Sequence, residues 1–172
     1  SIIGRARKRG LFEVSLYPLR QFADNPHRSV DDLAYGGGGG MVLRIEPLVS
    51  AVESIKERFP DALVIYFCPT GKRMDQSLIE TIPSKNKHLI LICGHYEGVD
   101  QRFIEGWVDH EFSLADIVFS GGELAAMAFA DATVRHLDGT LATPDAPKNE
   151  SFSLKDPENG SPLLEYPHYT RP

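Results

Sequence analysis

Two continuous apolar runs constrain the fold of this chain more than any other feature of its sequence. Ala62 to Cys68 and Leu89 to Cys93 are short and rich in β-branched and aliphatic residues. Runs of this kind are typical of strands that are buried on both faces, as in a parallel sheet covered by helices. Both runs are far shorter than the roughly 20 apolar residues that a membrane-spanning helix needs.

Helical patterns alternate with these runs. The apolar spacing predicts a helix over Glu46 to Phe59, with its apolar residues on one face. Further helices are expected over Gln76 to Ile82, which Pro83 would end, over Asp100 to Trp107, and over Glu123 to about Leu137. Strands that alternate with helices predict an α/β fold with a mainly parallel sheet.

The remaining segments are less regular. Leu11 to Tyr17 alternates apolar and polar residues, which predicts a strand with one solvated face, and Phe112 to Phe119 contains another strand-like stretch. Residues 24–40 indicate an extended loop that ends in five glycines. Residues 138–172 are polar and proline-rich, so we divide the chain into a domain over 1–137 and a tail over 138–172, either disordered or functional.

Composition and charge limit the possible functions. The two cysteines, Cys68 and Cys93, lack the spacing of a zinc site or a disulfide scaffold and are expected to be small core residues. No signal peptide is recognisable, so we expect a cytoplasmic protein without a membrane partner. The net charge of −6 disfavours nucleic-acid binding. Arg5, Arg7, Lys8 and Arg9 form a local basic cluster, which by itself indicates only a solvated helix face.

Three glycine-bearing loops follow the expected strands: Pro69 to Gly71, Gly94 to Gly98 and Ser120 to Glu123. Ligands of open α/β sheets bind outside the carboxyl ends of the strands, where glycine lets the backbone approach closely. The alternative is that these loops are only tight turns. No Gly-Lys-Ser/Thr follows the glycine run, and no GxGxxG fingerprint occurs. The residues alone therefore indicate an α/β ligand-binding domain, most simply an enzyme.

Four strings, in order along the chain, carry a resemblance to a known family. Asp31 to Met41, Gly94 to Asp100, Ser120 to Leu124 and Pro167 to Pro172 resemble the bacterial tRNA (guanine-37-N1)-methyltransferases, at nearly their spacing. Ser1 to Arg7 is similar to the family's first helix. The strand before that helix and the family's helical carboxyl-terminal domain have no counterpart here. The chain is thus expected to be a fragment, with part of the tRNA-binding surface beyond Pro172.

The resemblance implies a fold, a cofactor and an assembly. It implies a SPOUT-type deep trefoil knot, S-adenosylmethionine as methyl donor, and an obligate homodimer whose active sites are shared by two subunits. Glu97 would meet the donor's amino group, or would instead cap the helix that begins near Asp100. The donor-binding residues implied by the match are Tyr66, Phe67, Cys68, Pro69, Gly94, Tyr96, Glu97, Gly98, Leu114, Ala115, Asp116, Ile117, Val118, Phe119, Gly121 and Gly122.

The match also implies two catalytic residues. Guanine N1 carries a proton, so methylation there needs a general base and a cation near O6. The family's aspartate falls on Glu150, which we assign as the base, and its arginine falls on Arg135. Without the match, Glu150 would be an ordinary tail carboxylate and Arg135 a charge at a helix end. Glutamate is one methylene longer than aspartate, and Leu154 to Pro162 is longer than in the family, which makes the base the least secure assignment.

The substrate is expected to be a tRNA whose guanine is flipped out of its stack. The residues expected around that base are Asp31, Gly39, Gly40 and Ser151. Gly39 stands where the family often has proline. The tail would become ordered when tRNA and donor are both present. The resemblance suggests a magnesium requirement, but no metal ligands are assigned. Two alternatives stay open: a knotted methyltransferase that acts on another RNA, for example at a ribose 2′-hydroxyl, and a non-catalytic RNA-binding module.

Overall fold

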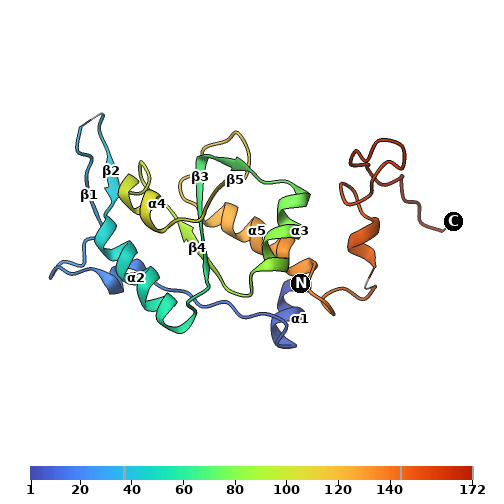
Figure 1. Ribbon diagram of the computed structural model, residues 1–172, viewed down its shortest axis with the longest axis horizontal. Coiled ribbons are helices and arrows are strands. Elements are labelled where there is room, and N and C mark those ends of the chain that lie inside the picture. Colours follow the sequence, from blue (N-terminus) through green and yellow to red (C-terminus); the bar gives the residue numbers. More distant parts are fainter. Residues whose placement is uncertain (37, 144, 172) are drawn as a thin grey trace.

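The computed structural model describes residues 1–36, 38–143 and 145–171. Helices and strands alternate along most of the chain, and the tail forms a separate lobe on the side of α3 (Figure 1). In chain order the elements are α1 (Ile2–Lys8), the 3-10 helix η1 (Leu19–Phe22), β1 (Asp31–Leu33), β2 (Met41–Leu43), α2 (Ile45–Arg58), β3 (Leu63–Arg73), α3 (Gln76–Lys85), β4 (Leu89–Cys93), α4 (Gln101–Trp107), β5 (His110–Ser113), α5 (Glu123–Arg135) and the 3-10 helix η2 (Ala146–Asn149).

A parallel sheet of order β4-β3-β5 forms the centre of the molecule. The two apolar runs supply β3 and β4, and these pair from Leu63 with Leu89 to Phe67 with Cys93. β3 lies in the middle, so both its edges are hydrogen-bonded. The predicted α/β class with a parallel sheet is confirmed.

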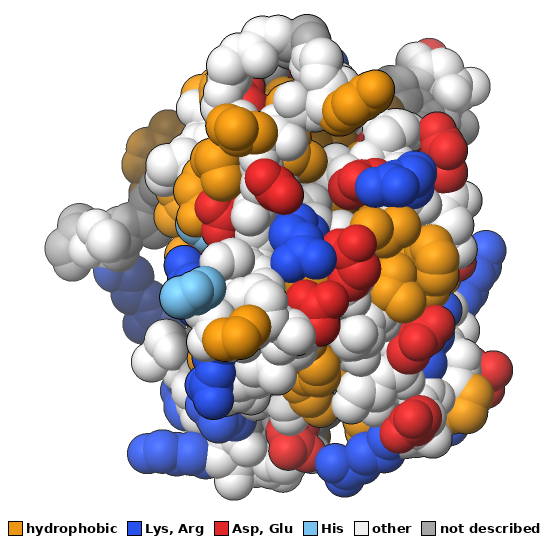
Figure 2. All heavy atoms as spheres, turned by 90° about the vertical axis from the view of Figure 1, so that its left-hand side faces the viewer, with side chains coloured by type: hydrophobic (Ala, Val, Ile, Leu, Met, Phe, Trp, Pro, Cys, Tyr) orange, Lys and Arg blue, Asp and Glu red, His pale blue; other side chains and the backbone are white. Residues whose placement is uncertain are grey.

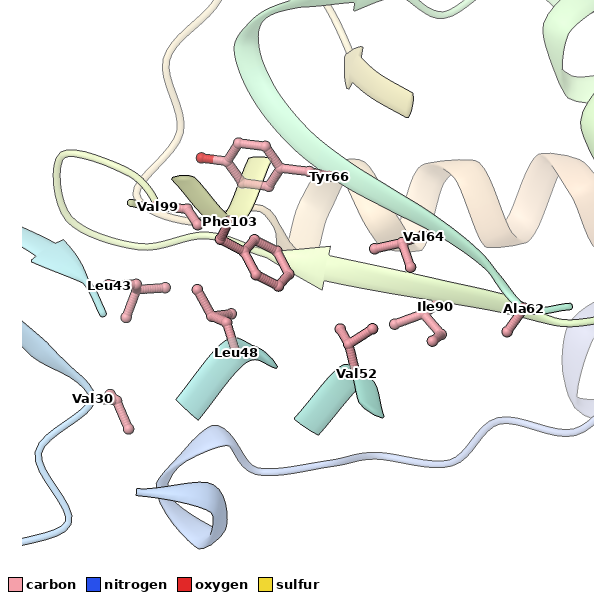
Figure 3. Close-up of a cluster of buried hydrophobic side chains, with 10 residues drawn as sticks. All are labelled: Val30, Leu43, Leu48, Val52, Ala62, Val64, Tyr66, Ile90, Val99 and Phe103. Atoms are coloured by element: carbon pink, nitrogen blue, oxygen red, sulfur yellow. The ribbon is translucent and has the colours of Figure 1, made fainter. Parts of the chain in front are cut away.

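Two apolar clusters lie on opposite faces of this sheet, because successive side chains of a strand point to opposite faces. Val64 and Tyr66 belong to one cluster, which includes Leu48 and Val52 of α2 and Phe103 of α4 (Figure 3). The intervening Ile65 and Phe67 belong to the other cluster, with residues of α3 and α5. Burial on both faces explains why this run shows no polar alternation.

Two predictions in the amino-terminal third are wrong. Leu11 to Tyr17 is not a strand, and Leu16 is 88% exposed. Alternation alone cannot form a strand without a partner edge, and no described strand pairs with this segment. The expected loop at 24–40 instead contains β1, which pairs antiparallel with β2. The glycine run connects the two strands, with positive φ angles at Gly36, Gly38 and Gly40 that favour glycine.

The boundaries of other elements differ slightly from the predictions. α3 continues through Pro83 to Lys85, and the side chains of Ser84 and Asn86 donate hydrogen bonds to carbonyls of its last turn. β5 ends at Ser113, so most of the strand-like stretch up to Phe119 is irregular. α2, β4 and α4 lie within one residue of their predicted ranges, and α5 ends two residues early.

The tail contains no α-helix or strand among its described residues, only η2 and an isolated bridge between Lys155 and Pro162. It packs against α3, where the Ser153 hydroxyl donates to Glu80 Oε1 at 2.6 Å. Within the described parts of the chain, no helix has the length and apolarity to cross a bilayer.

Candidate active site

The glycine turns that follow the parallel strands contact one another. The Gly122 amide donates to the Gly94 carbonyl at 2.9 Å, and an antiparallel bridge joins His95 to Gly121. A Cβ atom on Gly122 would lie 2.9 Å from the Cα of Cys93, which is backbone that cannot move aside. Two of the three glycine-bearing loops, Gly94 to Gly98 and Ser120 to Glu123, therefore meet through backbone contacts that only glycine permits. We call these two loops the donor turns.

We expect Gly122→Ala to disturb this junction. Overpacking of this kind costs about 1–3 kcal/mol of folding free energy, and donor affinity should fall with it. Gly106→Ala is the matched control, since a Cβ at Gly106 on α4 would meet nothing within 4 Å. Thermal unfolding and donor titration measure both effects. Equal donor affinity and equal melting temperature in the Gly122 variant and the wild type would contradict the close contact.

The carboxyl end of β3 also depends on close packing. The pairing of β3 with β5 shifts register between Phe67 and Lys72, across the expected donor residues Cys68 and Pro69. A Cβ on Gly71 would lie 2.6 Å from the Phe112 amide nitrogen. Cys68 and Cys93 are half-buried at the edges of the two clusters instead of fully in the core. Burial raises the pKa of Cys93 to about 11, so its thiol stays protonated at neutral pH.

Tyr66 supports the second turn from below. Its ring is 4% exposed, and a Cβ on Gly94 would lie 2.9 Å from a ring carbon. Burial, aided by the nearby Cys68 and Glu111, raises the pKa of Tyr66 to about 12. The Tyr66 phenol is therefore neutral, and its ring packs against the turn at Gly94 to Gly98.

The turn at residues 94–98 also joins the β1–β2 hairpin. The Glu97 amide donates to the Met41 carbonyl and the Leu43 amide to the Gly98 carbonyl, both at 3.0 Å. A Cβ on Gly40 would overlap the Glu97 side chain, so Gly40 lies directly against it. Gly39 and Asp31 belong to the same hairpin. Three of the four expected substrate residues thus lie beside the donor turns.

Glu97 does not cap α4. Asp100 is the N-cap, and its carboxylate accepts from the Arg102 amide at 3.0 Å. The capping alternative for Glu97 is therefore wrong. The Glu97 side chain is exposed. Tyr96 beside it is also exposed and has a φ of 60°, which turns the chain sharply at the loop.

A further segment of expected donor residues, Leu114 to Phe119, follows β5. Ile117 and Val118 are 59% and 81% exposed, and Ala115 accepts hydrogen bonds from the Ser113 hydroxyl and the Ile117 amide. Leu114 packs against the cluster of α3 and α5, which anchors the start of the segment. The expected donor residues of this segment are Leu114, Ala115, Asp116, Ile117, Val118 and Phe119, all outside regular structure.

Arg135 and Glu150, the two expected catalytic residues, bind each other. Arg135 Nη2 lies 2.5 Å from Glu150 Oε2, and Nη1 lies 3.3 Å from Oε1. The Glu150 side chain is 17% exposed and that of Arg135 is 34% exposed. Two parallel N–H···O bonds fix the relative orientation of both groups. The two side chains are therefore paired, and the catalytic roles expected for them stay a prediction.

This pair lies far from the donor turns of its own chain. The turns adjoin the start of α5, while Arg135 ends it. A helix of 13 residues is about 20 Å long. Ser151, the fourth expected substrate residue, lies with the pair, where its hydroxyl accepts from the Glu165 amide at 3.0 Å. The residues of the candidate site thus form two groups at opposite ends of α5.

Sequence reasoning missed the residues that hold the tail near Arg135. Gln76 Nε2 of α3 lies 3.0 Å from His136 Nε2 and donates to the Ser153 hydroxyl at 3.3 Å. Two hollows of about 340 and 390 Å³ lie between the tail and α3. Gln76 and Glu80 are four residues apart on one helix, a spacing too common to indicate a site.

A second missed contact lies at the donor turns. His95 Nε2 is 2.5 Å from Glu123 Oε1, which links the second turn to the first residue of α5. Among the described residues, no group of three or more His, Cys, Asp or Glu side chains is arranged to hold a metal ion.

These features define a class of protein. The parallel sheet, the helices on both of its faces and the adjoining glycine turns at its carboxyl edge are those of an α/β ligand-binding domain. The chain matches, over residues 1–172, the family model described as "tRNA (Guanine-1)-methyltransferase TrmD". It therefore belongs to the tRNA (guanine-1)-methyltransferase family, and the family resemblance seen in the sequence is confirmed.

Individual relatives agree with this assignment. The chain is 44% identical over 172 residues to a "tRNA (guanine-N(1)-)-methyltransferase" of Geobacter metallireducens, covering 100% of this chain and 67% of that protein. It is 47% identical over 173 residues to one of Desulforudis audaxviator, covering 100% and 66%. The chain spans about two thirds of the length of these relatives.

A solved structure shows the same fold. The "tRNA (m1G37) methyltransferase from Aquifex aeolicus" superposes with a TM-score of 0.76 at 39% sequence identity. The match covers 92% of this chain and 72% of that one. The fold of this chain is therefore of the SPOUT type.

Proposed function

We propose that this protein transfers a methyl group from S-adenosylmethionine to N1 of guanosine 37 in tRNA. The observation that carries the proposal is the pairing of Arg135 with Glu150 in a member of this family. Guanine presents an acceptor, O6, beside a donor, N1–H. Arg135 is a donor beside the acceptor Glu150, so the pair matches the pattern of that edge. Adenine presents the reverse pattern, so its donor would face the donor Arg135 and its acceptor would face the acceptor Glu150.

The donor turns suit S-adenosylmethionine. Gly94 and Gly122 let the two turns pack closely on Tyr66 and on each other at the sheet edge, and the exposed carboxylate of Glu97 suits a cationic amino group or sulfonium. When bound, the donor supplies an already activated methyl group, so the protein mainly aligns the reacting atoms. A magnesium requirement stays a prediction without ligands.

Glu150 and Arg135 supply the remaining chemistry. Glu150 accepts the N1 proton, and N1 is then able to attack the methyl carbon as the carbon–sulfur bond breaks. The negative charge left on the base spreads to O6, where Arg135 donates a hydrogen bond. The hydrogen bonds between Arg135 and Glu150 must therefore break before each residue can bind guanine.

One chain alone does not bring the two groups of site residues together. The donor turns and the pair stand about 20 Å apart along α5, whereas methyl transfer requires reacting atoms in contact, about 3–3.5 Å apart. A homodimer that places the pair of one subunit beside the donor turns of its partner removes this gap. We therefore keep the shared-site homodimer as part of the proposal.

Mixed dimers test this arrangement. A Glu150→Gln subunit and a Gly122→Ala subunit are each expected to form nearly inactive homodimers. In a mixed dimer, one of the two sites combines the intact donor turns of the Glu150→Gln subunit with the intact Arg135–Glu150 pair of the Gly122→Ala subunit. The other site contains both changes. Turnover per mixed dimer should approach half the wild-type value. If each site came from one chain, no activity would return.

Donor binding separates this proposal from an RNA-binding module. Calorimetry of the dimer with S-adenosylmethionine should give a saturable heat with one donor per donor-turn group. Gly122→Ala should weaken that binding, and Gly106→Ala should leave it unchanged. An absence of donor binding would favour a module that binds RNA without catalysis.

The proposal includes three further features. The chain forms the trefoil knot of its family. The domain over 1–137 holds the donor. The tail over 138–172 forms the active-site loop and the linker to a carboxyl-terminal domain. A cytoplasmic location follows from a tRNA substrate.

A further inference from the structure

We propose that the exposed basic face of α1, formed by Arg5, Arg7 and Lys8, binds phosphates of the RNA strand that carries the target guanine. This inference rests on the proposed function, because it concerns the same RNA. It assigns a role to a cluster that neither the donor turns nor the catalytic pair uses.

The position of α1 is the first observation. α1 packs against α5, and its Ala6 is 1% exposed at that contact. Arg9, directly after the helix, donates from Nη1 to the Gly139 carbonyl at 2.5 Å. Gly139 lies four residues beyond Arg135. α1 is therefore held at the end of α5 that carries the catalytic pair. Figure 1 shows the amino terminus of the chain, where α1 begins, beside this end of α5.

The state of the basic side chains is the second observation. Arg5, Arg7 and Lys8 are exposed, and no carboxylate among the described residues lies within 4.0 Å of their side-chain nitrogens. Residues 1–10 contain four basic and no acidic residues, although the whole chain carries a charge of −6. The first ten residues thus carry a local excess of positive charge in a chain that is acidic as a whole.

The opposite end of the molecule differs. Figure 2 shows the face around the hairpin, where acidic and basic side chains are interspersed with hydrophobic ones. A strand of RNA is attracted by a local excess of positive charge, and contacts to phosphate position it without reading sequence. The phosphates of a flipped nucleotide lie on the side of the base away from its Watson–Crick edge. With that edge at Arg135 and Glu150, the strand passes over the surface beside the pair, where α1 stands.

The salt dependence of RNA binding tests this inference. Each phosphate contact to a single strand contributes about 0.7 to the slope of log K against log salt, and a duplex contact about 0.9. Arg7→Gln/Lys8→Gln should therefore make the slope less steep by about 1.5, as measured with an unmodified tRNA carrying guanosine 37. Affinity at 0.1 M salt should fall about 30-fold if the two lines meet near 1 M.

A second double variant controls for net charge. Lys56→Gln/Arg58→Gln removes the same charge from the last turn of α2, which packs against α4 and η1. It should keep the wild-type slope. Equal slopes in the α1 variant and the wild type, or equal losses in both variants, would overturn the inference, provided unfolding shows all proteins folded. Methylation of guanosine 37 is measured separately. If the protein methylates N1 but the Arg7→Gln/Lys8→Gln variant keeps the wild-type salt slope, only the role of α1 is refuted. An RNA that binds through α1 without N1 methylation refutes only the proposed function.

Discussion

Glu150→Gln is expected to lower turnover about 100- to 10,000-fold, the usual contribution of a general base. Glutamine keeps the shape of the side chain and one acceptor oxygen, but it cannot accept the N1 proton. Donor affinity should remain at the wild-type value, because Glu150 is assigned to the N1 proton of guanine and not to a contact with the donor. Single-turnover methylation of tRNA, with the family's carboxyl-terminal domain attached, measures the effect.

Glu158→Gln is a suitable control, since Glu158 is an exposed carboxylate of the same tail. It should turn over as the wild type does. Wild-type turnover in Glu150→Gln would remove Glu150 from the mechanism, and a loss of donor binding in that variant would indicate a structural role instead.

Arg135→Ala should depress the rate about 100- to 1,000-fold, as expected when one group that stabilises a developing anion is removed. The loss should fall on kcat rather than on the donor dissociation constant. Arg135→Lys keeps the charge but cannot form two parallel hydrogen bonds to a carboxylate. We therefore expect the lysine variant to recover only part of the rate.

Lys148→Ala tests whether the loss is specific. Lys148 pairs with Asp145 in the same tail at 2.8 Å, and both side chains are largely exposed. Such a surface pair contributes little, so the control should stay within about twofold of the wild type. If Arg135→Ala changed only the donor dissociation constant, the assigned role at O6 would be wrong.

The sheet could be predicted from the sequence because a strand that is buried on both faces consists of a continuous apolar run. The run at Ala62 to Cys68 has no polar alternation, and the structure places its successive residues in two different clusters. The segment at Leu11 to Tyr17 shows the limit of such patterns. Its alternation satisfies the rule for a half-buried strand, but a strand needs a partner edge, and sequence periodicity does not identify one.

The candidate site could be predicted only in part. Glycines at strand ends predicted where the turns lie, but the contact of Gly122 with Gly94 joins loops 28 residues apart, so it depends on the tertiary fold. The residues alone gave Arg135 and Glu150 no special role. Only the family resemblance singled them out, and only the structure shows that they bind each other. The network of Gln76, Ser153 and His136 left no signal, because each residue is common on a polar surface.

We propose that this chain delivers a methyl group to one atom of one nucleotide. The most direct measurement is to incubate the protein with labelled S-adenosylmethionine and unmodified tRNA carrying guanosine 37, digest the product, and identify the methylated atom. We expect the label on N1 of guanosine 37 and no label when that position is adenosine. Label on a ribose 2′-oxygen, on another nucleotide, or on the adenosine would contradict it.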